Sequence, residues 1–272
     1  MNKIMYPIKN LFSLVMTNKN LIYTLTKRDI TSRYKGSAIG VLWSFITPIM
    51  MLAVYTFVFS VVFKAKWNIG STSKTEFALV LFSGLIIFNV FSECISRAPG
   101  LIVGNANYVK KVVFPVEILA IICLLTSLFN FIISFSVWLL FYIIFFGIPH
   151  IEILLLPIVL LPFFILILGL SWFLSSLGVY VRDIIQVIGI IIMIMMYLSP
   201  IFYPISLIPE AYQKFMYLSP LTYVVEQSRD VMMWGQGINW HAWFIYTGLS
   251  CVTAYLGCVW FNITKKGFAD VI

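Results

Sequence analysis

The residues of this chain that could perform chemistry are few, and their spacing matches no common catalytic motif. The sequence lacks GxxxxGK[ST], which would hold nucleotide phosphates, and it lacks HExxH and GxSxG, which mark many zinc and serine hydrolases. Its two histidines, His150 and His241, stand alone near the ends of apolar stretches, where we expect a structural role. We therefore predict no enzymatic activity, and no cofactor or metal bound by this chain.

Charged side chains inside apolar stretches are the next candidates, because burying a charge in lipid is costly. Glu93 and Arg97 lie one helical turn apart, and we predict that they pair. Arg182 and Asp183 are adjacent, so they do not face each other on a helix, and each needs another partner. The sequence places no acidic residue convincingly at mid-membrane, which argues against a proton- or sodium-coupled carrier.

The composition indicates the environment that must position these side chains. Of 272 residues, 61% are hydrophobic and 10% are charged, and the mean hydropathy is +1.01. Soluble domains are about 45–50% apolar and about 25% charged, so these values indicate an integral membrane protein and exclude a disordered chain. The net charge of +8 suits membrane topology and anionic lipid headgroups, and we predict no nucleic-acid partner. The four cysteines lie in apolar stretches without a CxxC, which is typical of small buried side chains.

Six stretches are long and apolar enough to cross a bilayer, which takes about 17–25 residues per helix. They predict an all-α integral membrane protein with one transmembrane domain over residues 1–272, divided into a tail (1–38), a six-span bundle (39–261) and a second tail (262–272). An even number of spans places both termini on one side, and the distribution of lysine and arginine assigns that side to the cytoplasm. The predicted spans are Ile39–Phe63, Phe77–Cys94, Val116–Phe146, Ile151–Val181, Ile184–Ile201 and Ala242–Phe261.

The N-terminal tail fits neither a span nor a solvated loop. Ile4, Ile8, Leu11 and Val15 recur at helical spacing, which predicts an amphipathic helix in the membrane interface. A second, polar helical stretch at residues 20–35 follows and leads into the first span.

The segment from Pro204 to Gly237 is too interrupted to span and too apolar for a solvated loop. Pro209 and Pro220 each suit the first turn of a short helix, and Ser219 is a candidate cap. We predict two short re-entrant helices in the outer leaflet, because backbone at that depth must be helical or packed within protein. Their apolar face, toward the bundle or the lipid, is predicted to contain Leu221, Val224, Val225 and Met232.

Five pieces of the sequence resemble, in order, ABC-2 type permeases that export polysaccharides. RDITSRYKGSAIGVLWSFITP at 28–48 resembles the start of the first span, and KKVVFP (110–115), VRDI (181–184), LSPIFYPISLIP (198–209) and SPLTYVVEQSRD (219–230) follow. The family usually has Asn-Pro where this chain has Ser219-Pro220, but both residue types cap helices. The resemblance covers nearly the whole chain.

The resemblance implies the channel-forming membrane subunit of an ATP-driven exporter in the bacterial cytoplasmic (inner) membrane. Such a permease works as a homodimer with two copies of a separate ATPase subunit, which binds the ATP and Mg. It moves a lipid-linked polysaccharide, commonly on undecaprenyl pyrophosphate, and O-antigen is the first candidate cargo. Capsule polysaccharide and teichoic acid are alternatives. An ion-coupled carrier or channel, and a membrane enzyme acting on lipid-linked sugars, are more distant alternatives.

Three groups of residues are predicted to serve this transport. The first group lies where the tail meets the first span, and its guanidinium donors suit the carrier's pyrophosphate. The second group includes a short helix in the connection from residue 97 to 115, which is expected to dock on the ATPase. The third group belongs to the outer helices, which are expected to gate the exit. Without the resemblance, the same residues fit general attraction to anionic lipid, an ordinary polar loop and an interfacial aromatic belt. The groups are Arg28, Arg33 and Lys35 for the pyrophosphate; Arg97, Asn105, Asn107, Arg182 and Asp183 for the ATPase; and Tyr203, Tyr217, Tyr223, Glu226, Arg229 and Asp230 for the outer gate and sugar path.

Overall fold

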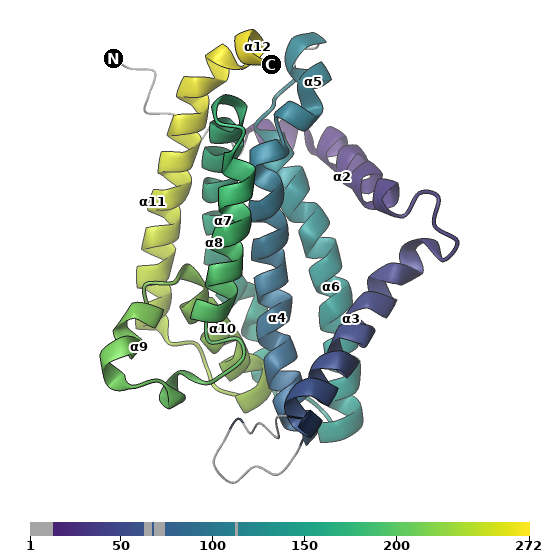
Figure 1. Ribbon diagram of the computed structural model, residues 1–272, viewed down its shortest axis with the longest axis vertical. Coiled ribbons are helices and arrows are strands. Elements are labelled where there is room, and N and C mark those ends of the chain that lie inside the picture. The colour runs from purple at the N-terminus through teal and green to yellow at the C-terminus, as the bar shows by residue number, and fades with distance from the viewer. Residues whose placement is uncertain (1–12, 63–66, 68–73, 112–113) are drawn as a thin grey trace.

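The computed structural model describes residues 13–62, 67, 74–111 and 114–272. Long helices form an elongated bundle, and shorter helices lie at its two ends (Figure 1). In chain order the helices are α2 (Lys19–Arg33), α3 (Trp43–Tyr55), α4 (Lys74–Arg97), α5 (Ala106–Lys111), α6 (Ile118–Phe146), α7 (Leu156–Tyr180), α8 (Ile184–Leu198), α9 (Glu210–Met216), α10 (Pro220–Arg229), α11 (Trp240–Thr264) and α12 (Phe268–Val271).

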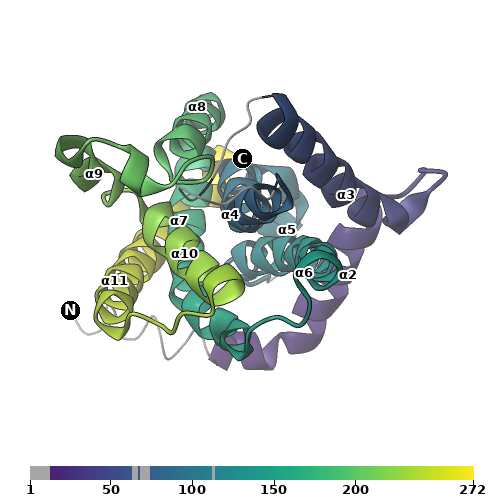
Figure 2. The same ribbon diagram turned by 90° about the horizontal axis from the view of Figure 1, so that it is seen from below.

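The helix α4 forms the centre of the bundle, and Figure 2 shows it surrounded by α3, α6, α7, α8 and α10. In the most apolar part of residues Thr75–Gly100, which include most of α4, 83% of the residues are buried. In that of residues Gly40–Phe59, which include α3, only 11% are buried. The helix α3 therefore lies at the edge of the bundle, where its apolar side chains face outward. Buried residues of α4, α6, α7, α10 and α11 join in one contiguous hydrophobic cluster.

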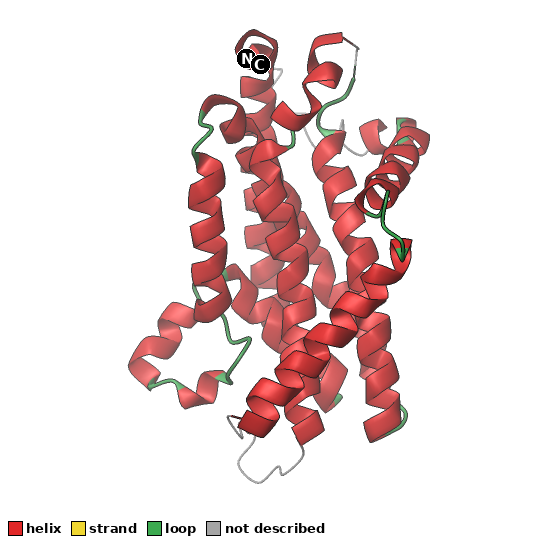
Figure 3. Ribbon diagram, turned by 45° about the vertical axis from the view of Figure 1, so that its right-hand side comes forward, coloured by secondary structure: helices red, strands yellow, loops and turns green. Residues whose placement is uncertain are grey.

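The all-helical prediction is confirmed for the described residues, which contain no strand (Figure 3). Within them, five helices are long and apolar enough to cross a membrane: Gly40–Phe59, Thr75–Gly100, Ile118–Phe146, Ile151–Tyr180 and Trp240–Val271. The remaining predicted span corresponds to α8, an apolar helix of 15 residues. At 1.5 Å per residue α8 is about 22 Å long, shorter than a hydrocarbon core of about 30 Å, so the sixth crossing stays a prediction.

The helices α2, α5 and α12 lie at the same end of the bundle, and α9 and α10 lie toward the other end (Figure 1). This arrangement agrees with both tails lying on one side of a membrane, while the identity of that side stays a prediction. The predicted polar helical stretch at residues 20–35 is confirmed as α2. Of the predicted amphipathic stripe in the tail, Ile4, Ile8 and Leu11 lie outside the described residues, and Val15 is helical.

The close packing of α7 against α11 depends on glycine. A Cβ atom added to Gly257 would lie 2.1 Å from the carbonyl oxygen of Gly169, and one added to Gly169 would lie 2.5 Å from the Cα atom of Ala254. Small residues let membrane helices approach closely where lipid provides no hydrophobic drive. This contact fixes the last span against the fourth predicted span.

Candidate functional site

Four charged side chains join the tail helix α2 to the central helix α4, and we call them the tail–span cluster: Asp29, Arg33, Glu93 and Arg97. Arg97 Nη2 donates to both carboxylate oxygens of Asp29, at 3.0 and 2.9 Å. Arg33 forms an ion pair with Glu93, and it lies 3.8 Å from Asp29. The predicted pair of Glu93 and Arg97 is present at 3.7 Å, but it is one side of a larger arrangement.

The local spacing of each helix builds this cluster. Asp29 and Arg33 are four residues apart on α2, as Glu93 and Arg97 are on α4, so each helix presents one acid and one base on one face. Asn130 on α6 adds a hydrogen bond from Nδ2 to Glu93 Oε2 at 3.0 Å. The four side chains retain 22–32% exposure, and their formal charges balance. Asp29 and Asn130 were not predicted as site residues. Asp29 lies in the piece at 28–48 that resembles the permease family, whereas Asn130 stands out in the sequence only as a polar residue in an apolar stretch.

The three cations predicted to bind a pyrophosphate have different surroundings. Arg28 Nη1 donates to the hydroxyl oxygen of Tyr108 at 2.7 Å, and its guanidinium carbon lies 5.8 Å from the centroid of that ring. Arg33 belongs to the tail–span cluster. Lys35 follows the end of α2, is exposed, and forms no ion pair with another described residue. Arg28 and Lys35 therefore retain more freedom than Arg33 to bind an anion.

The connection after α4 contains the predicted short helix, α5, which projects at one end of the bundle (Figure 1). Asn107 is exposed, whereas Asn105 is partly buried and donates from Nδ2 to the carbonyl oxygen of Leu101 at 2.9 Å. A Cβ atom added to Gly178 of α7 would lie 2.1 Å from the carbonyl oxygen of Pro99. The beginning of this connection is thus held directly against the end of α7.

Arg182 and Asp183 lie on the exposed turn between α7 and α8, and neither forms an ion pair with a described residue. The partner that we expected for each is therefore absent from the described part of the chain. At the same end of the bundle, Lys265 Nζ lies 2.5 Å from Oε1 of Glu117, whose side chain is 9% exposed. This second ion pair joins the end of α11 to the start of α6.

The segment before α11 contains the two predicted short helices, α9 and α10. Pro209 directly precedes α9, and Pro220 is the first residue of α10. The predicted cap is confirmed, because Ser219 Oγ accepts a hydrogen bond from the backbone N–H of Leu221 at 3.4 Å. The predicted apolar face is buried against the bundle, with Leu221, Val224, Val225 and Met232 all 0–1% exposed. Their re-entrant position in a bilayer stays a prediction.

Arg229, at the end of α10, points into the bundle, where it is 2% exposed. Its Nε donates to the carbonyl oxygen of Val80 at 3.1 Å, its Nη2 donates to that of Ile201 at 2.8 Å, and its Nη1 donates to that of Pro200. Its guanidinium carbon lies 4.4 Å from the centroid of the Trp67 ring. No carboxylate within the described residues pairs with it at ion-pair distance. Arg229 thus fixes α10 and the loop after α8 to the central helix.

The other residues predicted for the outer gate are dispersed. Tyr203 donates to the carbonyl oxygen of Tyr197 at 2.5 Å, and Tyr223 packs on Tyr246 with ring centroids 4.9 Å apart. Tyr217 is exposed at the end of α9. Glu226 lies three residues before Arg229 and Asp230 directly after it, and burial raises the pKa of both carboxyl groups. A common passage lined by the three tyrosines stays a prediction.

The described residues contain no group of three or more histidine, cysteine or acidic side chains that could hold a metal ion. Cys94, Cys123 and Cys258 are free and buried, as predicted, and Cys251 is free but exposed. Cys94 Sγ lies 3.0 Å from Ser127 Oγ, so one of these thiols takes part in the packing of α4 against α6.

Comparisons with known proteins assign the chain to a family. The chain is similar to the O-antigen export system permease protein RfbA of Klebsiella pneumoniae, with 25% identity over 254 residues that cover 93% of this chain and 95% of that protein. It is 28% identical to RfbA of Myxococcus xanthus, over 71% of each chain. It is 26% identical to the polysialic acid transport protein KpsM of Escherichia coli, over 91% of this chain and 95% of that protein. A family model described as ABC-2 type transporter matches residues 20–233, from the tail helix α2 to the residues just after α10. The chain therefore belongs to the ABC-2 type transporter family, as its sequence pieces predicted.

Proposed function

We propose that this chain is the membrane subunit of an ATP-driven exporter that moves a lipid-linked polysaccharide, with O-antigen as the first candidate cargo, across the bacterial inner membrane. The observation that carries the proposal is the likeness to O-antigen export permeases over 93% of the chain. The likeness to the polysialic acid transport protein KpsM favours a capsule polymer as the second candidate.

The exporter needs a separate ATPase, because this sequence has no phosphate-binding loop of its own. We propose a second copy of this chain and two ATPase subunits as partners, with ATP and Mg bound by the latter. The helix α5 and the exposed turn at Arg182 and Asp183 are the proposed contacts, because they lie at the end of the bundle that carries the tails. Both termini would then face the cytoplasm.

Genetic complementation with a biochemical readout tests the proposal. Deleting the gene should remove the polymer from the cell surface and leave its lipid-linked form inside the cell. The chain reconstituted with the ATPase subunit from the same organism should support ATP-dependent transfer of that polymer into vesicles. An ATPase variant unable to hydrolyse ATP is the control. Transfer that continues without ATP would contradict the proposal and favour a channel or an ion-coupled carrier.

Disulfide cross-linking tests the proposed contact with the ATPase. Asn107→Cys is the better probe, because Asn107 is exposed while Asn105 is hydrogen-bonded to the backbone of Leu101. Leu218→Cys at the opposite end of the bundle is the control, since Leu218 is 82% exposed. Efficient cross-linking of the ATPase from Leu218 but not from Asn107 would reverse the proposed orientation.

The carrier's pyrophosphate is proposed to bind Arg28, Arg33 and Lys35. Because Arg33 also pairs with Glu93, a simple loss of export in Arg33→Ala is ambiguous. Adding Glu93→Gln removes the Glu93 carboxylate that Arg33→Ala leaves without its arginine partner. If Arg33 binds phosphate, the double variant stays defective; recovery of export would assign Arg33 to structure alone. Arg33→Lys then tests whether the two parallel N–H donors of the guanidinium group are needed, since lysine keeps the charge but lacks these paired donors.

A further inference from the structure

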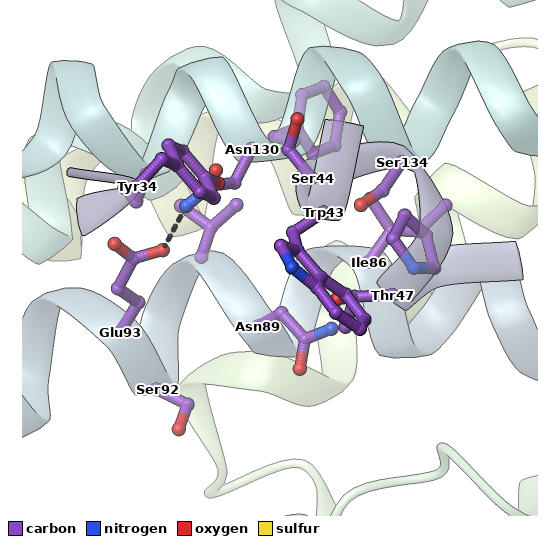
Figure 4. Close-up of a pocket in the computed structure, with 14 residues that line it drawn as sticks. Tyr34, Trp43, Ser44, Thr47, Ile86, Asn89, Ser92, Glu93, Asn130 and Ser134 are labelled. Carbon is purple, nitrogen blue, oxygen red and sulfur yellow. Dashed lines mark hydrogen bonds between the residues drawn. The ribbon is translucent and has the colours of Figure 1, made fainter. Parts of the chain in front are cut away.

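A pocket of about 370 Å³ opens beside the tail–span cluster, between α3, α4 and α6 (Figure 4). Its size lies within the range of roughly 300–1,000 Å³ that is usual for small-molecule sites. Much of its lining is polar although it lies along three predicted spans. Its polar lining includes Ser44, Thr47, Asn89, Ser92, Asn130 and Ser134.

Several of these polar groups have no partner inside the described protein. The side chains of Asn89, Thr47 and Ser134 form no hydrogen bond with another described residue. The Asn130 side chain donates to Glu93, as the dashed line in Figure 4 marks. Asn89 lies eight residues before Arg97 on α4, or about 12 Å deeper along the helix axis. An amide at that depth is costly unless a polar group meets it. The pocket therefore has the chemistry of a site for a polar occupant.

The lining offers hydrogen bonds but no unpaired charge. Its one charged side chain, Glu93, is already paired with Arg33 and bonded to Asn130. An anionic or a cationic headgroup would thus lose water without gaining a counter-charge. Trp43 extends into the pocket beside Asn89 (Figure 4), and the flat apolar face of an indole ring suits the C–H face of a sugar. Hydroxyls, amides and an aromatic ring together favour an uncharged sugar.

A second pocket of about 370 Å³ lies further along α3, α4 and α6, away from the cluster, and the segment after α3 also lines it. On α3 the lining passes from Ser44 and Thr47 to Ile49 and Leu52, and on α6 it passes from Ser134 to Phe141 and Phe145. The first pocket is polar and aromatic, and the second is almost wholly apolar. The cleft thus has a polar end and an apolar end in line, which is the polarity profile of a lipid.

We propose that the cleft between α3, α4 and α6 binds a membrane lipid with an uncharged glycosyl headgroup, with the sugar in the polar pocket and a hydrocarbon chain in the apolar one. This occupant differs from the pyrophosphate-linked carrier, whose charge the polar pocket does not match. The site would hold α3, otherwise the least buried span, against α4 and α6.

Photolabelling tests the site without depending on export. The full chain with its ATPase partner, in nanodiscs, is exposed to a monoglucosyl diacylglycerol that carries a photoactivatable group in one acyl chain. Mapping of labelled peptides should place the adducts on residues 49–57 or 141–145. A phosphatidylglycerol probe with the same acyl chain should label these peptides weakly.

A matched pair of serine variants on α6, with a third variant on α4, separates binding in the pocket from binding to the general lipid-facing surface. Ser134→Leu should lower labelling about fivefold, the loss expected for one hydrogen bond of about 1 kcal/mol, and Asn89→Leu should lower it similarly. Ser136→Leu is the control, because Ser136 is exposed on α6 outside the pocket lining. Equal labelling by both probes, an equal effect of all three variants, or protection by the lipid-linked polymer would each overturn the proposal. The last result would instead place the cleft on the transport path.

Discussion

Arg97 on α4 and Asp29 on α2 are joined through one guanidinium nitrogen, which donates to both carboxylate oxygens at 3.0 and 2.9 Å. Arg97 is also the last residue of α4, directly before the connection that carries α5. The pair therefore links the tail helix to the central span at the point where the proposed ATPase contact begins. A movement of this connection would therefore be transmitted to α2 through the ion pair of Arg97 and Asp29.

A double-mutant cycle tests this link. Asp29→Asn and Arg97→Gln should each lower the melting temperature of the purified protein, and the double variant should be less destabilised than the sum of the two. We expect a coupling energy of about 1 kcal/mol, because both side chains are partly exposed and solvent screens the pair. Simple additivity would show that the contact contributes nothing to stability.

The stability of the protein should depend on both the size and the charge of the side chain at position 229. Arg229→Met removes the guanidinium donors from three carbonyl oxygens, of which only that of Val80 keeps another side-chain donor, Ser83 Oγ. This variant should reduce the yield of folded protein, with a loss of about 3 kcal/mol or more. Arg229→Lys keeps the charge but reaches fewer of these oxygens, so its loss should be smaller. Folded yield and thermal melting in detergent measure both. A methionine variant as stable as the parent would contradict the anchoring role.

The space around Arg229 provides a second, independent test. A Cβ atom at Gly84 would lie 2.5 Å from Arg229 Nη2. Gly84→Ala should therefore displace the guanidinium group and destabilise the segment from Pro204 to Gly237. Gly248→Ala on α11 is the matched control, because a Cβ atom there meets no atom within 4 Å. The control should be neutral or slightly stabilising, since alanine favours a helix over glycine by at most about 1 kcal/mol. Equal effects on thermal melting would rule out a specific contact.

Gly178 should be required for coupling to the ATPase. Gly178→Ala forces the end of α7 away from Pro99 and should therefore displace the connection that carries α5. We expect the assembled complex to lose export-linked ATP hydrolysis while this chain still inserts into the membrane. Gly189→Ala on α8, where a Cβ atom meets open space, should leave hydrolysis unchanged. Normal coupling in Gly178→Ala would separate this contact from the proposed role of α5.

Two adjacent lysines give a matched comparison at the end of α11. Lys265→Ala leaves the largely buried Glu117 without its cation and should destabilise the protein by about 1–3 kcal/mol. Lys266→Ala should change stability little, because Lys266 is exposed and forms no ion pair with a described residue. Chemical or thermal unfolding in detergent distinguishes them. Equal stability of the two variants would show that the ion pair of Lys265 and Glu117 does not help to hold α6 against α11.

Local chemistry allowed much of this protein to be predicted from its sequence. Composition and the length of apolar runs predict membrane helices, because lipid leaves the backbone few other structures. Pro220 and Ser219 mark the start of α10 through the geometry of one helical turn, and the spacing of Leu221 and Val224 identifies its buried face.

The tertiary structure decided which distant residues meet. Asp29 and Arg97 are 68 residues apart, and Arg229 and Val80 are 149 apart, so no local spacing relates them. A helical repeat places Arg229 on a polar side of α10 but does not show that α4 and the loop after α8 surround that side with carbonyl oxygens. Likewise, Asn89 and Ser134 each look like an isolated polar residue until α3, α4 and α6 bring them to one pocket. Helix periodicity is a property of a single segment, whereas ion pairs and pockets depend on how several segments pack.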